Sequence, residues 1–193
     1  MSQLSIPSPS VGAFHLGPLT IHIYALCILA GIVIAYIGGE RRYQACDGKQ
    51  EHFEELCTLG VIAGIIGGRL YHVITDHQLY FGPGRTWYHS LFIWQGGLGI
   101  WGAITLGGLA ILLYCRHKDI RFAPVADSLA PGILAAQAIG RLGNWFNQEL
   151  FGRPTSLPWG LEIDLAHRPA GYLQYATFHP TFLYELLWNL AGA

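Results

Sequence analysis

The sequence predicts an all-α fold in which a bundle of helices crosses a membrane, and two observations support this. Of 193 residues, 52% are hydrophobic and only 12% are charged, whereas a soluble domain usually carries about 25% charged residues. The mean hydropathy is +0.35. The apolar residues also gather into stretches of about 20, the length that a helix needs to cross a bilayer. We therefore expect a polytopic bundle with four complete spans and a partial fifth, in a single membrane-embedded domain over residues 1–193.

The expected spans differ in their charge content. In chain order they lie at residues 19–39, 56–75, 91–115, 123–145 and from 180 onward. The first and third contain no charged residue. The second contains Arg69, and the fourth contains Asp127 and Arg141 near its two ends. The fifth stretch ends before it could cross, and this predicts that the chain is an N-terminal fragment.

Positive charges indicate the orientation of the spans, because cytoplasmic loops carry an excess of Lys and Arg. The loops after the first and third spans hold six of them, and the opposite side holds three. The six are Arg41, Arg42, Lys49, Arg116, Lys118 and Arg121, and the three are Arg85, Arg153 and Arg168. This bias predicts a cell-membrane protein with its N-terminus outside. The polar excursion at residues 146–179 then faces outward, and its prolines argue against one long helix.

Composition also argues against several functional classes. The net charge is −1, so nothing suggests nucleic acid as a partner. The four cysteines form no CxxC pair, and no His, Cys, Asp and Glu set has the spacing of metal ligands. We therefore expect neither a metal nor a cofactor. No Lys or Arg precedes the first apolar run, so we expect no cleaved signal peptide.

Small residues recur on the second span, where Gly60, Gly64 and Gly68 occupy every fourth position. This spacing lets helix backbones approach closely, and we interpret it as helix packing. Arg69 follows directly. An arginine at membrane depth costs roughly 2.5–3.5 kcal/mol on insertion scales, so it needs a reason. It either extends its guanidinium to the interface or belongs to a polar site, such as a second phosphate contact.

The fourth span carries a more specific polar pattern. If the helix extends far enough, Gln137, Arg141, Asn144 and Gln148 share one face. Such a stripe is expected to line a cavity or polar interface inside the bundle. A guanidinium binds phosphate oxygens with two parallel hydrogen bonds, so the stripe predicts an anionic lipid headgroup as ligand. Pairing of Arg141 with Asp127 is the structural alternative.

Residues 140–152 read GRLGNWFNQELFG and bring Asn147, Glu149 and Gly152 next to the stripe. This run resembles the signature of the prolipoprotein diacylglyceryl transferases, G-R-x-G-N-F-x-N-x-E-x-x-G, and only Trp145 departs from it. Three further segments are similar to motifs of that family in the same order. They are GPLTIHIYAL at 17–26, which contains Tyr24, GGRLYHV at 67–73 and HPTFLYE at 179–185.

The resemblance implies a seven-span bacterial membrane enzyme and a definite reaction. The diacylglyceryl group of phosphatidylglycerol passes to the lipobox cysteine thiol of a preprolipoprotein, which forms a thioether and releases glycerol phosphate. The thiolate is the nucleophile, and the leaving phosphate needs stabilisation. In this reading Arg141 binds the phosphate, with Asn144 and Asn147 as hydrogen-bond donors. Glu149 orients that arginine or accepts a proton, and Tyr24 contacts the headgroup or the thiol.

Two departures from the family pattern affect these expectations. Many members carry a histidine in the third-span motif, whereas GGLGIWGA at 96–103 has Trp101 there, as is typical of the actinobacterial branch. The base therefore stays open among Glu149, Tyr24, His22 and groups outside this chain. The family's last third carries further essential charged residues, so we expect the 193-residue polypeptide alone to be inactive.

Two other functions fit parts of the pattern. Buried arginines and small-residue helices also suit a transporter or channel, which predicts polar residues at several depths. A non-catalytic protein that binds anionic lipid is the second alternative. Both arginines lie towards one side of the expected bundle, and this favours a headgroup site over a path across the membrane.

Overall fold

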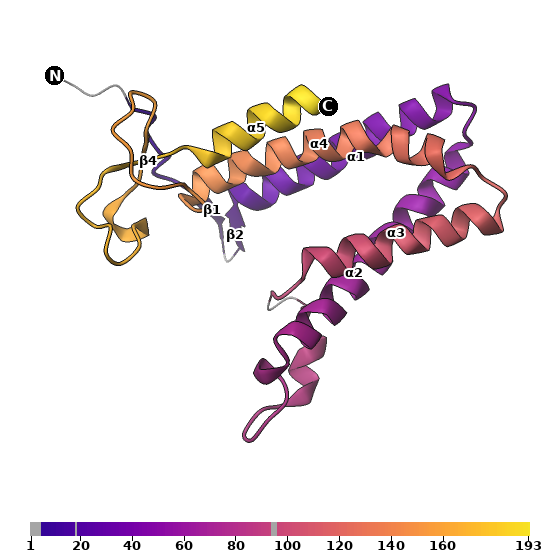
Figure 1. Cartoon of the computed structure of the whole chain (residues 1–193), viewed down its shortest axis with the longest axis horizontal. Helices are drawn as coiled ribbons and strands as arrows, with labels where there is room; N and C mark the ends of the chain where they lie inside the picture. Colours follow the sequence, from indigo (N-terminus) through magenta and orange to yellow (C-terminus); the bar gives the residue numbers. More distant parts are fainter. Residues whose placement is uncertain (1–4, 18, 94–95) are drawn as a thin grey trace. The chain divides into compact units, whose positions relative to one another are not determined.

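The computed structural model describes residues 5–17, 19–93 and 96–193. In chain order its elements are β1 (Ala13–Leu16), β2 (Leu19–His22), α1 (Ile23–Ala45), α2 (Gln50–Thr75), η1 (His77–Leu79), η2 (Trp87–Leu91), α3 (Ile100–His117), α4 (Phe122–Asn147), β3 (Leu161–Glu162), η4 (Leu165–His167), β4 (Thr177–Phe178) and α5 (Thr181–Gly192). The fold is mostly helical, as predicted (Figure 1).

Four helices of the described residues, α1 to α4, are long and apolar enough to cross a membrane. Large apolar side chains on them stay exposed, such as Ile32 on α1, Val61 on α2 and Ile104 on α3. Side chains of this kind on the surface of a helix are suited to lipid contact rather than to water. The prediction of a polytopic membrane protein is confirmed, and α5 forms the short fifth helix.

Two predicted spans begin later than the hydropathy suggests. Residues 19–22 pair with β1 in an antiparallel hairpin that has Gly17 at its turn. The first helix therefore starts at Ile23, and it continues through Arg41 and Arg42. The third helix starts only at Ile100, because Gly96 and Gly97 hold positive φ angles of 86° and 79° that interrupt a helix. Trp94 and Gln95, inside the predicted third span, lie outside the described residues.

The chain divides into two compact units, Met1–Gly39 with Asp127–Ala193, and Glu40–Ala126. In the second unit α2 and α3 run side by side in opposite directions (Figure 1). The closest approach is between Gly67 and Gly102, where a Cβ on either would collide with the other's carbonyl oxygen. Gly60, Gly64 and Gly68 also face α3, which confirms their interpretation as packing residues.

In the first unit α4 packs between α1 and α5. Gly31 of α1 lies against Ala136, and Gly132 of α4 lies against Ala35. On the α5 side, the rings of Trp145 and Phe182 stack at 5.5 Å. These contacts hold both helix pairs antiparallel, and they bring the start of α1, the end of α4 and the start of α5 together (Figure 1).

Residues 148–180 form a small packed head rather than a loose loop. Its core consists of Leu161, Ile163, Phe178 and Phe182. β3 pairs antiparallel with β4, and Ile6 of the N-terminal segment bridges to Leu161 on the other side. Trp145 Nε1 donates to the carbonyl oxygen of Pro7 at 3.2 Å. The N-terminal residues therefore belong to the head and tie it to the end of α4.

Candidate functional site

The last turn of α4 and the residues after it form a cluster of polar side chains around Arg141. The helix ends at Asn147, and the next residues turn sharply, with Gln148 at φ 52° and Leu150 at φ 53°. These left-handed positions stop the helix and direct Glu149 back, so that its amide donates to the Asn144 carbonyl oxygen at 3.1 Å. The helix end therefore places Arg141, Asn144, Asn147 and Glu149 together.

The guanidinium of Arg141 has two partners. Nη2 forms an ion pair with Glu185 Oε2 on α5 at 2.6 Å, and Nη1 donates to Asn144 Oδ1 at 3.2 Å. The side chains of Arg141 and Glu185 are 30% and 49% exposed. An ion pair this open contributes little net stability, so another anion could replace the carboxylate. The ionic partner is Glu185, and not Asp127 as in the structural alternative.

Glu149 acts on Arg141 through an amide rather than directly. Its Oε1 accepts hydrogen bonds from Asn144 Nδ2 at 2.9 Å and from Asn147 Nδ2 at 3.2 Å. Because Glu149 engages the amide nitrogen of Asn144, the amide oxygen is turned toward Arg141. Asn144 is only 5% exposed. The arrangement fixes the guanidinium from one side, and within the described residues Nη2 pairs with the replaceable carboxylate of Glu185.

The helix α4 contains three of the four residues of the predicted polar stripe. Arg141 and Asn144 are hydrogen-bonded to each other, and Gln137 lies one turn earlier at an exposed position. Gln148 leaves the stripe, because the helix ends before it. Its amide, 4% exposed, bonds Asp164 Oδ2 at 2.6 Å and the Pro9 carbonyl oxygen at 3.3 Å. Gln148 therefore joins the head to the N-terminal segment.

Tyr24 and two glycines adjoin the cluster. A Cβ on Gly143 would lie 2.5 Å from Tyr24 Cδ2, so the tyrosine ring packs directly on α4 beside Asn144. A Cβ on Gly152 would lie 2.8 Å from the Cβ of His179, and the Gly152 amide donates to the His179 carbonyl oxygen at 2.9 Å. The structure thus gives Gly152 a close backbone contact with His179.

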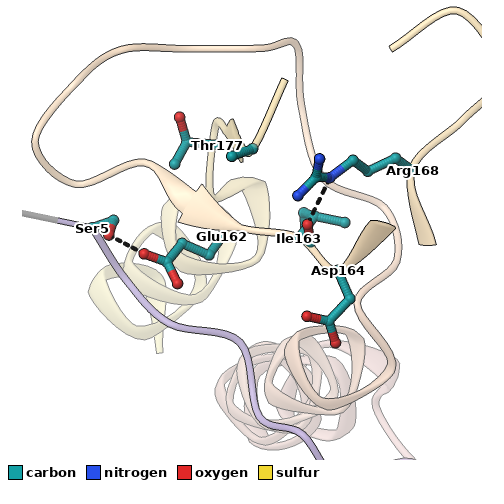
Figure 2. Close-up of a pocket in the computed structure, with 7 residues that line it drawn as sticks. Ser5, Glu162, Ile163, Asp164, Arg168 and Thr177 are labelled. Atoms are coloured by element: carbon teal, nitrogen blue, oxygen red, sulfur yellow. Dashed lines mark hydrogen bonds between the residues drawn. The ribbon is translucent and has the colours of Figure 1, made fainter. Parts of the chain in front are cut away.

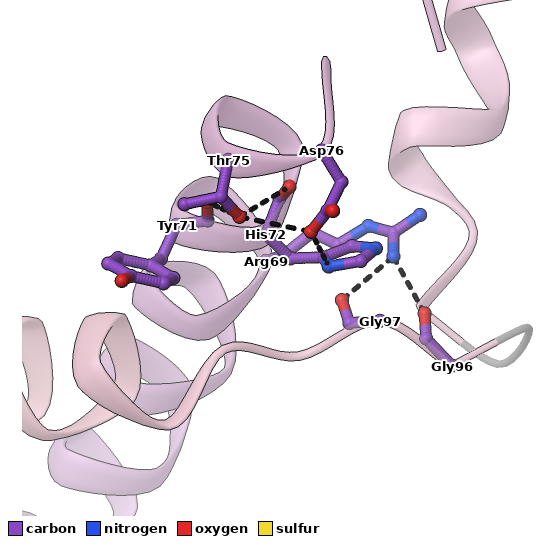
Figure 3. A network of polar contacts seen from close by, with 7 residues as sticks. All are labelled: Arg69, Tyr71, His72, Thr75, Asp76, Gly96 and Gly97. Atoms are coloured by element: carbon purple, nitrogen blue, oxygen red, sulfur yellow. Dashed lines mark hydrogen bonds and ion pairs between the residues drawn. The ribbon is translucent and has the colours of Figure 1, made fainter. Parts of the chain in front are cut away.

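Arg69 belongs to the other unit and is nearly buried, at 7% exposure. Its guanidinium donates to four backbone carbonyl oxygens, those of His89, Ser90, Gly96 and Gly97, at 2.6–2.9 Å. Figure 3 shows the two glycine contacts beside the pair His72–Asp76, whose Nδ1 and Oδ2 atoms lie 3.0 Å apart. Tyr80 covers the guanidinium at 5.1 Å.

Four of the five N–H donors of Arg69 are therefore occupied by backbone. This differs from the expectation of a phosphate contact, and also from an arginine that extends to the interface. In this structure Arg69 holds the segment that precedes α3, where backbone carbonyls would otherwise lack donors.

A hollow of about 330 Å³ lies on the head, between β3, β4 and the N-terminal segment (Figure 2). Its polar side chains are engaged within the protein. Ser5 donates to Glu162, and Arg168 Nε donates to the Ile163 carbonyl oxygen at 2.8 Å. Asp164 accepts from Gln148. These contacts stabilise the head, and they do not resemble the open guanidinium of Arg141.

Sequence reasoning did not assign three residues that the structure brings to this region, His179, Tyr184 and Glu185. All three belong to the segment HPTFLYE, which supported the family resemblance without a role for each side chain. The available signal was a carboxylate within an apolar stretch at Glu185, which needs a cationic partner. Its partner could not be identified before the packing of α5 on α4 was known.

Comparisons with known proteins agree with this geometry. The family model described as prolipoprotein diacylglyceryl transferase matches residues 11–193. A phosphatidylglycerol–prolipoprotein diacylglyceryl transferase from Cutibacterium acnes is 89% identical over the whole chain, which covers 65% of that protein. The corresponding proteins from Streptomyces coelicolor and Bifidobacterium adolescentis are 55% and 47% identical, with 61% and 60% of their lengths covered. The chain thus spans less than two thirds of these relatives, and it belongs to the prolipoprotein diacylglyceryl transferase family.

Proposed function

We propose that this chain, a multi-pass bacterial membrane protein, carries the phosphate-binding part of a diacylglyceryl transfer site. The substrates are phosphatidylglycerol and the lipobox cysteine of a preprolipoprotein, as the names of the relatives indicate for the lipid and the protein. The product is a thioether, and glycerol phosphate leaves. The N-terminus and the polar excursion at residues 146–179 face outward in this proposal, so the site lies at the outer leaflet.

The observation that supports this function is the geometry around Arg141. Asn144 holds one side of the guanidinium at 3.2 Å, and Glu149 holds Asn144 at 2.9 Å. On the other side, Nη2 pairs with a half-exposed carboxylate, that of Glu185. A lipid phosphate that replaces this carboxylate meets a donor already fixed in direction. Fixed donors stabilise the charge that develops on a leaving phosphate without reorganising first.

The transfer reaction provides the decisive experiment. Because the chain spans 65% of the Cutibacterium acnes relative, it is first extended with the remaining residues of that relative. The extended protein is placed in nanodiscs that contain phosphatidylglycerol, and thioether formation on a lipobox peptide is followed by mass spectrometry. The Cutibacterium acnes relative is the positive control. Removal of one such donor in other enzymes costs about 100- to 1,000-fold in rate, so we expect Arg141→Ala to lose at least 100-fold. Arg153→Ala, which removes an exposed arginine of the same segment, should change the rate little.

Arg141→Lys separates binding from chemistry. A lysine keeps the charge but has no planar fork, so the variant should retain phosphatidylglycerol and lose transfer. If neither property changes in Arg141→Ala, Arg141 is not the phosphate site. If the chain and all its variants bind phosphatidylglycerol but none transfers it, the chain acts as a lipid-binding protein instead.

A further inference from the structure

We propose that Tyr184 and His179 form a proton relay that deprotonates the thiol, an inference that rests on the proposed transfer reaction. The two residues lie where the head meets α5. β4 ends at Phe178, His179 follows, and Tyr184 lies in the first turn of the helix that begins at Thr181. Their side chains meet, with His179 Nδ1 and Tyr184 Oη 3.1 Å apart.

A third side chain leaves the Tyr184 hydrogen available for His179. Trp159 Nε1 lies 3.1 Å from Tyr184 Oη, and an indole nitrogen can only donate. The Tyr184 oxygen is therefore an acceptor toward Trp159 and keeps its single hydrogen. The relay uses the His179 tautomer in which Nδ1 is unprotonated and accepts this hydrogen, while Nε2 carries the ring proton. The phenol is thus polarised by a donor on one side and a proton acceptor on the other.

Backbone contacts hold His179 in place. Its amide donates to the Arg153 carbonyl oxygen at 3.0 Å, and its own carbonyl oxygen accepts from the Gly152 amide at 2.9 Å. The missing side chain at Gly152 leaves room for this approach. A pair whose backbone is fixed on both sides keeps its geometry, which a proton transfer requires. Tyr184 is 40% exposed, so a substrate can reach its hydroxyl.

The relay and the proposed phosphate site both involve the start of α5. Tyr184 directly precedes Glu185, which pairs with Arg141 at 2.6 Å, and all of these residues belong to the same compact unit. The carbon that the thiol attacks is bonded to a phosphate oxygen. The base must therefore act within a few ångströms of the group that binds the phosphate.

The other candidates fit this requirement less well. The Oε1 atom of Glu149 is engaged by two amide groups, so it serves to orient Asn144. Trp101 cannot accept a proton, because an indole nitrogen only donates. Tyr24 lies on the opposite flank of α4, where it packs against Gly143, and His22 pairs with Ala13 in the hairpin of β1 and β2.

In the proposed step, every bond that breaks is matched by a bond that forms. The S–H bond of the cysteine breaks and its proton passes to Tyr184 Oη, while the proton of Tyr184 passes to His179 Nδ1. The thiolate forms the C–S bond with its own electron pair, and the C–O bond to the phosphate breaks with the pair on oxygen. The imidazolium then returns the proton to the departing phosphate or to water. No oxidant or further reactant is needed.

The pH dependence of transfer, measured in the protein extended with the remaining residues of the Cutibacterium acnes relative, tests the relay. At pH 6.5 Tyr184→Phe and His179→Gln should each lower the rate by about 100-fold, the lower range for loss of a general base. The defect should shrink about tenfold per pH unit up to about pH 8.5, the ordinary pKa of a thiol, where the thiol ionises unaided. Tyr172→Phe, which removes an exposed hydroxyl of the same head, should match the unmodified protein at every pH.

A second measurement does not require transfer. The alkylation rate of the lipobox thiol by iodoacetamide at pH 6.5 should rise when the peptide is bound to the chain, and this increase should be lost in Tyr184→Phe. Phosphatidylglycerol binding should be unchanged in both relay variants, and this separates their failure from failure of the Arg141 site. The relay is refuted if the defect stays constant with pH, if lipid binding falls in parallel, or if binding leaves the alkylation rate unchanged.

Discussion

Substitution of Gly143 by alanine tests whether the proposed site depends on direct contact between α1 and α4. The new Cβ would lie 2.5 Å from Tyr24 Cδ2 and 3.2 Å from Tyr24 Cα, whereas carbon atoms pack best at about 3.5–4.0 Å. The ring could rotate away, but the Cα belongs to the backbone of α1. The two helices must therefore separate, and overpacking of this kind costs about 1–3 kcal/mol.

Gly140 provides the matched control on the same helix. A Cβ there would meet only Ile28 Cδ1, at 3.7 Å, which is ordinary contact. Both substitutions remove a helical glycine and so share the gain in helix propensity, about 1 kcal/mol. The difference between them isolates the steric term. We expect the free energy of unfolding of Gly143→Ala to lie about 1–3 kcal/mol below that of Gly140→Ala.

Reversible unfolding in mixed micelles with increasing dodecyl sulfate, followed by tryptophan fluorescence, measures this difference. Gly143→Ala should also weaken phosphatidylglycerol binding, because Asn144 follows Gly143 directly and positions Arg141. Equal stability and equal lipid binding of the two variants would show that Tyr24 does not pack on Gly143 as described.

The same logic applies to α2 and α3, where Gly67→Ala should destabilise the protein by about 1–3 kcal/mol in that assay, because its Cβ would meet the Gly102 carbonyl. Gly64→Ala, with 3.6 Å to the Ala103 oxygen, should not. In Arg69→Lys the new side chain has three donors for four backbone carbonyl oxygens, so the segment is held less firmly. Proteolytic cleavage at residues 76–99 should therefore be faster in Arg69→Lys and unchanged in the control Arg85→Lys. Gln148→Ala removes a buried amide that makes three hydrogen bonds, to Asp164 and to the Pro9 carbonyl oxygen, at a cost of about 1–3 kcal/mol. The loss should appear as faster hydrogen exchange at the amides of Ile6 and Glu162, and unchanged exchange would contradict it. The control Gln137→Ala, at an exposed position, should leave the exchange rates unchanged.

The spans could be predicted because the stability of a helix in lipid depends mainly on its own apolar length. Their starts could not, because residues 19–22 and 91–99 are equally apolar. The hairpin with β1 takes the first of these segments out of the helix. In the second, Gly96 and Gly97 hold positive φ angles that interrupt a helix, and Arg69 donates to their carbonyl oxygens.

At the candidate site, the sequence by itself determined which residue types come together. Arg141, Asn144, Asn147 and Glu149 lie within one short run, so the end of a single helix positions them. Only the tertiary structure decided what they face. Glu185 reaches Arg141, and Tyr184 reaches His179 and Trp159, because α5 packs antiparallel on α4 and the head folds back over its start. The physical reason is that an ion pair or a relay between distant segments depends on how helices pack against each other, and local sequence does not encode that arrangement.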